Sequence, residues 1–230
     1  MGMTGRGRTH AAALVASAAL LTAATPVPAP DLPPDLPERR AGLWEIRTLG
    51  HLPGAIKTYE ERTRICVDAA VDRALYRADL EAKAVTVADR GGACDAPVHA
   101  LDGHRLSMTM HCSSAGAEGR AGGQTIFEST TTFAGPDLVT VVHRRLHPGN
   151  TAFPGESVYH DTMTRIGVCA PGQRPGDRIR LDSRLDGSES QNSRRIDNLF
   201  DASRTPHKMM EDLLAAYRRA EAAAEMWRER

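Results

Sequence analysis

The stretch from Cys94 to Cys112 constrains the fold of this chain more than any other. It reads CDAPVHALDGHRLSMTMHC, with a cysteine at each end and Asp102-Gly103 near its middle. That dipeptide between two alternating arms is the strongest short-range signal of a β-hairpin. The stretch therefore predicts two antiparallel strands whose open end carries both cysteines.

Two registers are open to this hairpin. A two-residue turn pairs Leu101 with His104, whereas a three-residue loop pairs Leu101 with Arg105 and Cys94 with Cys112. A shift of one residue moves a whole strand to the other face, and only the second register sorts the side chains by polarity. In that register one face carries Cys94, Ala96, Val98, Ala100, Leu106, Met108, Met110 and Cys112, and the other carries Asp95, His99, Arg105, Ser107, Thr109 and His111.

The second register predicts a Cys94–Cys112 disulfide, because directly opposed Cβ atoms lie near bonding distance; two buried free thiols are the alternative. The chain has four cysteines, which allow three pairings. If the segment after Cys66 crosses over before the hairpin, strand directions place Cys66 and Cys169 at the same end of the sheet. We therefore predict Cys66–Cys169 as the second disulfide. The cysteines are widely spaced and lack a CxxC motif, so a zinc site is not expected.

The start of the chain has the layout of a secretory signal peptide. Residues 1–10 contain Arg6 and Arg8 and no acidic residue, and a small-residue apolar run, AAALVASAALLTAA, follows. We expect cleavage after Ala24, with Ala29 as the alternative site. Four cysteines in an exported chain fit an oxidised framework, so we predict a periplasmic or secreted protein without a membrane span after cleavage.

Residues 25–40 are proline-rich and predict an extended linker. The domain proper is expected over residues 41–169, as a curved antiparallel sheet of about seven strands with one short helix. Asp68 is a candidate cap for that helix, which we expect to end near Tyr76. Residues 78–92 are ambiguous, with a possible short strand at 84–88. The remaining strands are expected at residues 41–48, 56–66, 124–133, 138–147 and 157–166.

The composition changes after Cys169. Residues 170–204 are rich in Arg, Asp, Ser and Gly and predict a disordered linker. Thr205-Pro206 then begins an expected C-terminal helix over residues 205–230. Its apolar stripe predicts contact with an envelope protein or self-association, and it includes Met210, Leu213, Leu214, Tyr217 and Trp227.

These features together resemble a known family. The chain has a Gly-Leu-Trp-Glu-Ile start at residues 42–46, Cys-Val-Asp ahead of a short helix, a cysteine-bounded hairpin and a closing strand that leads to a final cysteine. Over residues 41–169 it is similar to domain-of-unknown-function family 3617 of bacterial exported proteins. The resemblance implies export in a Gram-negative bacterium and a small β-rich domain, and it implies no activity.

No motif in the sequence carries catalytic or cofactor chemistry, so we predict a protein that is not an enzyme and has no cofactor. Ser107, His99 and Asp95 share the polar face of the predicted hairpin, but alternation alone creates such coincidences, and no GxSxG elbow is present. Candidate metal ligands are His99, His104, His111, His143, His147 and His160, whose spacing does not force convergence. We interpret them as surface histidines.

Lys and Arg together number 29, as do Asp and Glu, so the chain has no basic excess for nucleic acid. The leading hypothesis is a non-catalytic binding or envelope-associated β domain. The alternatives are a carrier of a small apolar ligand on a concave sheet, which needs an apolar pocket of a few hundred Å³, and a metal-dependent enzyme.

Overall fold

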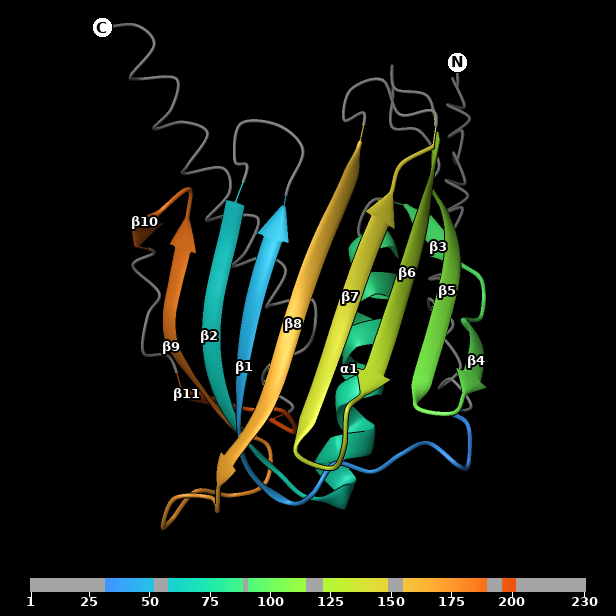
Figure 1. Ribbon diagram of the computed structural model, residues 1–230. Coiled ribbons are helices and arrows are strands. Elements are labelled where there is room, and N and C mark those ends of the chain that lie inside the picture. Colours follow the sequence, from blue (N-terminus) through green and yellow to red (C-terminus); the bar gives the residue numbers. More distant parts are fainter. Residues whose placement is uncertain are drawn as a thin grey trace, which may run out of the picture.

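The computed structural model describes residues 32–51, 58–88, 91–114, 122–148, 155–189 and 196–201. These residues form one open antiparallel sheet of 11 strands and one helix (Figure 1). The strand order is β10-β9-β2-β1-β8-β7-β6-β5-β3, with β11 paired to β9 and β4 paired to β5. The elements are β1 (Gly42–His51), β2 (Thr58–Val67), α1 (Ala69–Ala88), β3 (Gly92–Cys94), β4 (Val98–Asp102), β5 (Arg105–Ser114), β6 (Gly123–Phe133), β7 (Leu138–Leu146), β8 (Glu156–Gly167), β9 (Asp177–Leu185), β10 (Ser188–Glu189) and β11 (Ile196–Asn198).

The mainly β, antiparallel prediction is confirmed, but the expected number of strands is too low. The first arm of the cysteine hairpin is divided into β3 and β4, and β9, β10 and β11 lie in the stretch expected to be disordered. That expectation is wrong for these strands. The polar sequence of β9 is compatible with a strand because its charges pair across the ladder, as Arg62 with Asp182 and Glu61 with Arg180 do.

The helix is longer than predicted, since α1 runs for 20 residues and includes the stretch proposed as a short strand at 84–88. Asp68 caps it as expected, because its carboxylate accepts a hydrogen bond of 2.8 Å from the backbone N–H of Val71. The following Ala, Leu, Glu and Lys residues are strong helix formers, and Lys83 pairs with Asp79 one turn earlier. Helix propensity and packing thus outweigh the β-branched residues near its end.

The turn of the hairpin is shorter than the predicted three-residue loop. Asp102 pairs with Arg105, and Gly103 takes a φ of 57°, a region that glycine adopts readily. Cys94 nevertheless pairs with Cys112, because the first arm contains one extra residue between β3 and β4. Pro97 lies in this bulge, where its missing N–H disrupts no ladder bond.

The bulge shifts β4 by one residue, so its predicted face assignment is reversed. His99 now pairs with Met108 and Leu101 with Leu106, both on the apolar side. Val98 faces the opposite way and is 69% exposed. The predicted grouping of His99 with Ser107 and Asp95 is therefore wrong.

Both predicted disulfides are present. Cys94–Cys112 joins β3 to β5 with a Cα–Cα distance of 4.0 Å, and Cys66–Cys169 joins the end of β2 to the segment after β8 with a distance of 5.4 Å. The crossover made by α1 brings both pairs together, as the strand-direction argument requires. The two bonds indicate a non-cytoplasmic environment.

We call the side of the sheet on which α1 lies the inner face and the opposite side the outer face. One buried cluster on the inner face is centred on the strands β1, β2, β7 and β8, and it contains Trp44, Ile65, Val67, Val71, Leu106, Phe133, Val139, Val141 and Met163. A second lies under the C-terminal half of α1 and contains Leu80, Val87, Met108, Met110, Cys112 and Phe127. Together they form the core.

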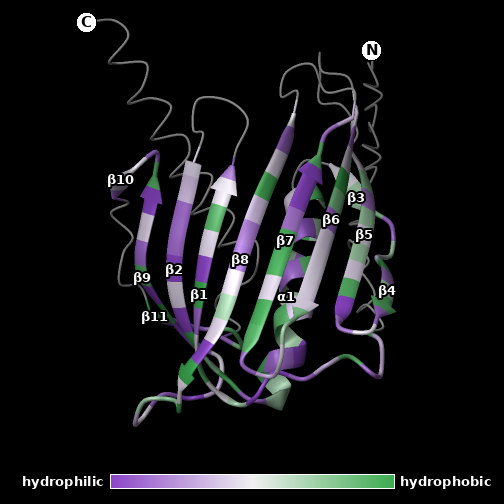
Figure 2. Cartoon of the chain, in the orientation of Figure 1, coloured by the Kyte–Doolittle hydropathy of each residue, from purple (hydrophilic) through white to green (hydrophobic). Residues whose placement is uncertain are grey.

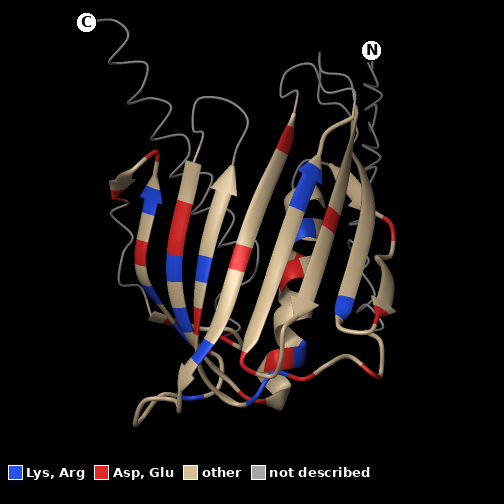
Figure 3. Cartoon of the chain, in the orientation of Figure 1, with Lys and Arg blue, Asp and Glu red and all other residues tan. Residues whose placement is uncertain are grey.

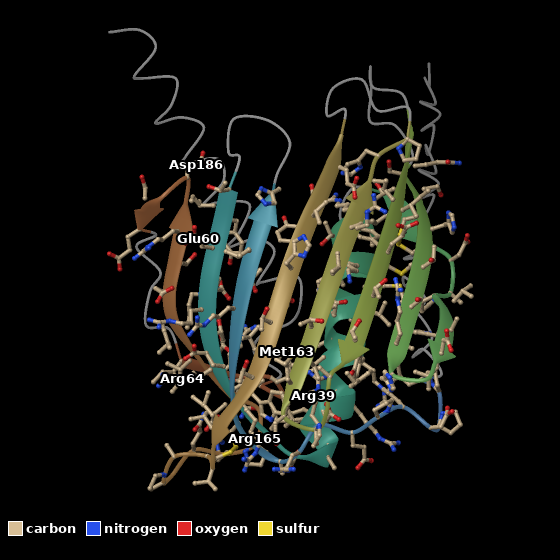
Figure 4. The ribbon with its side chains drawn as sticks, viewed as in Figure 1. Arg39, Glu60, Arg64, Met163, Arg165 and Asp186 are labelled. Carbon is tan, nitrogen blue, oxygen red and sulfur yellow. A yellow bond between two sulfur atoms is a disulfide. The ribbon has the colours of Figure 1, made fainter. Side chains whose placement is uncertain are left out.

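The residues just before β1 are packed on the core, which corrects the predicted linker boundary. Leu36 contacts the first cluster, and Arg39 is only 6% exposed. The guanidinium of Arg39 pairs with the buried carboxylate of Asp72 and lies 3.0 Å from the sulfur of Met163, beside which Figure 4 shows it. The signal peptide, residues 25–31 of the linker and the C-terminal helix lie outside the described residues.

Candidate binding surface

The outer face is the side of the sheet opposite α1, and no described helix covers it (Figure 1). The ladder register aligns one row of side chains across β1, β8, β7, β6 and β5 on this face. The row, which we call the threonine row, consists of Arg47, Thr162, Thr140, Thr132 and Arg105. Neighbouring strands lie about 4.8 Å apart, so the row places three hydroxyl groups between two arginines.

A second row beside the first extends this surface. It consists of Leu49, His160, Val142, Thr130 and Ser107. Threonine is common in strands because its branched side chain suits a pleated surface. The 129–132 run is therefore divided by alternation, with Thr130 and Thr132 on the outer face and Ser129 and Thr131 on the inner face.

The two arginines of the threonine row have different surroundings. Arg47 donates to Glu45 over 3.0 Å yet keeps 68% of its side chain exposed. Arg105 is exposed, and no carboxylate of the described residues lies within ion-pair distance of it. One end of the row therefore carries a cation available to an acidic partner.

Glu45 is the buried anion of this face. It accepts hydrogen bonds from Arg47 and Arg64, the latter at 3.2 Å. Burial raises the pKa of Glu45, but the hydrogen bonds and charges of the two arginines outweigh it and hold the pKa below its usual value. The carboxylate stays ionised at neutral pH and keeps both arginines oriented across β1 and β2.

Charged residues on this side of the sheet gather on β2 and β9. Figure 3 shows blue and red bands along β2, and Figure 4 places Glu60 and Arg64 on this strand. Arg62 pairs with Asp182 at 2.7 Å across to β9. Arg62 and Arg64 on β2 are paired with Asp182 and Glu45, so their charges are compensated, unlike that of Arg105 at the end of the threonine row.

One histidine, His143 on β7, lies in a polar cluster on the inner face. Its Nε2 is 3.3 Å from Asp161 on β8, and Ser129 lies opposite it on β6. The Nδ1 atom of His143 is buried without a hydrogen-bond partner. Among the described contacts, His143 makes no hydrogen bond with Ser129, so the histidine does not activate this hydroxyl as a nucleophile in this arrangement.

The carboxylate of Asp79 on α1 belongs to the same cluster. Burial raises its pKa, but the charge of Lys83 and the interaction with His143 outweigh this and lower the pKa below its usual value. The charges of Asp79 on α1 and His143 on β7 thus interact across the inner face.

The other histidine candidates do not converge. His99 lies on the inner face of β4, where burial lowers its pKa, while His104 is exposed at the hairpin turn. His147 lies 3.2 Å from the hydroxyl of Thr125, and His160 belongs to the second outer row. No group of three or more His, Cys, Asp or Glu side chains among the described residues is placed to hold a metal ion.

His111 lines a shallow pocket at the open end of the hairpin. The pocket has a volume of about 110 Å³ and also contains Asp95 and Gln124. Its polar lining and small volume do not match the apolar cavity that a lipid-like ligand needs.

In comparisons with known proteins, no family model, no curated protein and no solved structure matches this chain. Within the described ranges, no helix is long and apolar enough to cross a membrane.

Proposed function

We propose that the protein is an exported, non-catalytic binding domain of the bacterial envelope that contacts an acidic, hydroxyl-rich polymer through the threonine row. The observation that carries this proposal is the row itself, with Thr162, Thr140 and Thr132 aligned between Arg47 and Arg105. A hydroxyl group both donates and accepts hydrogen bonds. A polymer with repeated hydroxyl groups can therefore bond to several members at once, and an arginine recognises its carboxylates.

The signal-peptide pattern, the two disulfides and the resemblance to family 3617 support a location in the envelope. Both the location and the resemblance are part of the proposal. Peptidoglycan is a polymer of that compartment that combines hydroxyl groups and carboxylates, and we propose it as the partner. The carrier and metal-enzyme alternatives receive no support from the polar pocket or from the separated histidines.

Cosedimentation of the full-length mature protein with purified peptidoglycan sacculi tests the proposal. The variant Thr140→Val with Thr162→Val removes two hydroxyl groups and keeps the side-chain shape. At about 1 kcal/mol for each hydrogen bond, binding should weaken by roughly tenfold or more. Thr48→Val on the inner face of β1 is the matched control and should bind as the wild type does. Binding that the double variant leaves unchanged would refute the assignment of this row.

A further inference from the structure

The small pocket at the open end of the hairpin is built from three segments of the chain on the outer face. Asp95 directly follows β3, and its backbone N–H donates to the carbonyl oxygen of His111 over 2.8 Å. Alternation along β5 places His111 and Ser113 on the face opposite the buried Cys112 side chain. β6 adds Gln124, which pairs with Ser113. The pocket therefore has a mainly polar wall and a volume of about 110 Å³.

The polar side chains of this pocket have no partner among the described residues. Asp95, His111 and Gln124 are exposed, and none of their side chains makes a hydrogen bond or an ion pair with a described residue. The carboxylates of Glu45 and Glu156 on the same face are, in contrast, paired with arginines. Asp95 thus brings an uncompensated negative charge to the pocket.

A primary ammonium group matches this set of side chains. It has three N–H donors and no acceptor. The carboxylate of Asp95 would balance its charge and accept one hydrogen bond, and the carbonyl oxygen of Gln124 and the hydroxyl of Ser113 would accept the others. A volume of about 110 Å³ exceeds the roughly 10–15 Å³ that one water needs. The pocket therefore has room for an ammonium group and the methylene carbon that carries it.

Strand β5 connects this pocket with the threonine row. Its outer-face side chains are all polar, and they are Arg105, Ser107, Thr109, His111 and Ser113. Arg105, a member of the threonine row, lies six residues from His111, which is about 20 Å along an antiparallel strand. The outer face thus offers a free cation at one end of β5 and the free carboxylate of Asp95 at the other. A partner that carries both carboxylates and amines complements both ends.

We propose that the pocket between Asp95, His111 and Gln124 binds a free primary ammonium group on the peptide branches of the polymer that the threonine row contacts. The inference rests on the proposed function for the identity of that polymer. It adds a second point of recognition, because the threonine row and Arg105 contact hydroxyl groups and carboxylates, whereas the pocket selects a cation.

Cosedimentation of the full-length mature protein with two preparations of sacculi tests this inference. One preparation is native, and in the other the free amines are acetylated, which removes their charge and keeps the carboxylates and the glycan. The wild type should bind the acetylated sacculi about tenfold more weakly, because hydrogen bonds to charged groups are among the stronger ones. Asp95→Asn should bind native sacculi as weakly as the wild type binds acetylated ones, and it should no longer distinguish the two preparations.

Two further variants separate the pocket from general effects of charge. Glu81→Gln removes the same charge from an exposed residue of α1, on the other side of the sheet, and should bind native sacculi as the wild type does. Gln124→Leu removes an acceptor from the pocket without changing the net charge, and should lose part of the preference for native sacculi. Circular dichroism of each variant checks that the fold is retained.

Equal binding of the wild type to both preparations, or unchanged binding of Asp95→Asn, would overturn the inference. The double variant Thr140→Val with Thr162→Val separates this result from a failure of the proposed function. If the double variant weakens binding and neither acetylation nor Asp95→Asn does, the threonine row stands and the pocket is refuted. If acetylation and Asp95→Asn weaken binding and the double variant does not, the pocket stands and the threonine row is refuted. Absence of binding to native sacculi would refute both.

Discussion

The two halves of the sheet are stabilised in different ways. The half formed by β5, β6 and β7 lies over α1 and encloses a cluster of buried apolar side chains around Met110 and Phe127. The half formed by β9 and β2 carries more charge, with Arg178 paired to Asp197 and Arg180 to Glu61. Figure 2 shows the contrast, with more hydrophilic colour along β2 and β9 and hydrophobic bands on β5 and β7.

This contrast shows that a strand such as β9 can belong to one continuous ladder while contributing no side chain to the buried apolar clusters, whereas β2 contributes Ile65 and Val67 at one end. Burial stabilises the α1 half by roughly 1.5–3 kcal/mol for each large apolar side chain removed from water. Exposed ion pairs contribute about 0–1 kcal/mol each, so the β2–β9 half depends more on backbone pairing and on covalent links.

The largest expected effect concerns those links. Replacing Cys66 and Cys169 by serine opens a connection across 103 residues, whereas the Cys94–Cys112 pair spans 18. The chain-entropy model gives losses of about 4.7 and about 3 kcal/mol for the two pairs. Urea denaturation of both double variants measures these losses. A greater loss from the hairpin pair would contradict the claim that the charged half depends more on its disulfide.

Arg39 and Arg40 allow a buried ion pair to be compared with an exposed one. Arg39→Ala leaves the carboxylate of Asp72 buried without its partner, and both side chains are less than 5% exposed. We expect a loss of about 3–5 kcal/mol in the free energy of unfolding. Arg40→Ala is the control, because the Arg40–Asp137 pair is exposed and should contribute about 0–1 kcal/mol. If Arg39→Ala and Arg40→Ala lowered the free energy of unfolding by similar amounts, residues 36–40 would not be packed on the core.

A matched pair of substitutions compares the two halves directly. Met110 is 1% exposed in the covered half, and Met110→Ala should cost about 2–5 kcal/mol because it leaves a cavity. Arg62→Ala in the charged half removes a pair whose side chains are 43% and 31% exposed, and should cost about 0–1 kcal/mol. Urea denaturation of the two variants measures both losses of stability. Equal losses would contradict the claim that the two halves are stabilised in different ways.

Acid should produce the smallest effect, spread over both halves. The pKa values of Glu45 and Asp79 are lowered in the folded protein by their cationic neighbours. Folding therefore favours the ionised carboxylates, and this stability is present above their ordinary pKa range of about 4–4.5. It is lost as the pH falls through the lower folded values. The acid-unfolding transition of Glu45→Gln, followed by circular dichroism, should be less steep than that of the wild type. An unchanged transition would contradict the lowered pKa of Glu45.

The covered half was largely predictable from the sequence, because alternation and cysteine spacing are local signals. The pattern of residues 94–112 predicted the hairpin and its disulfide, and the strand directions predicted Cys66–Cys169. The turn register was not predictable, since Pro97 absorbs one residue in a bulge between β3 and β4. A bulge changes the face of every later residue in the arm, as His99 and Val98 show.

The charged half was missed because composition was interpreted as disorder. β9 contains few apolar residues, and its partners on β2 lie more than 100 positions earlier in the chain. Cross-strand charge pairs of this kind have no signature within one segment. The threonine row was missed for the same reason, since its members come from five strands and only the register aligns them.

The most direct test of the proposed binding surface locates the contact itself. Amide and methyl NMR spectra of the full-length mature protein would be followed during titration with soluble peptidoglycan fragments. The account predicts shifts concentrated at Thr162, Thr140, Thr132 and Arg105, with little change at Tyr59 on the inner face. Shifts confined to the inner face would contradict the proposed binding surface. So would the absence of shifts with fragments that compete with sacculi for the protein.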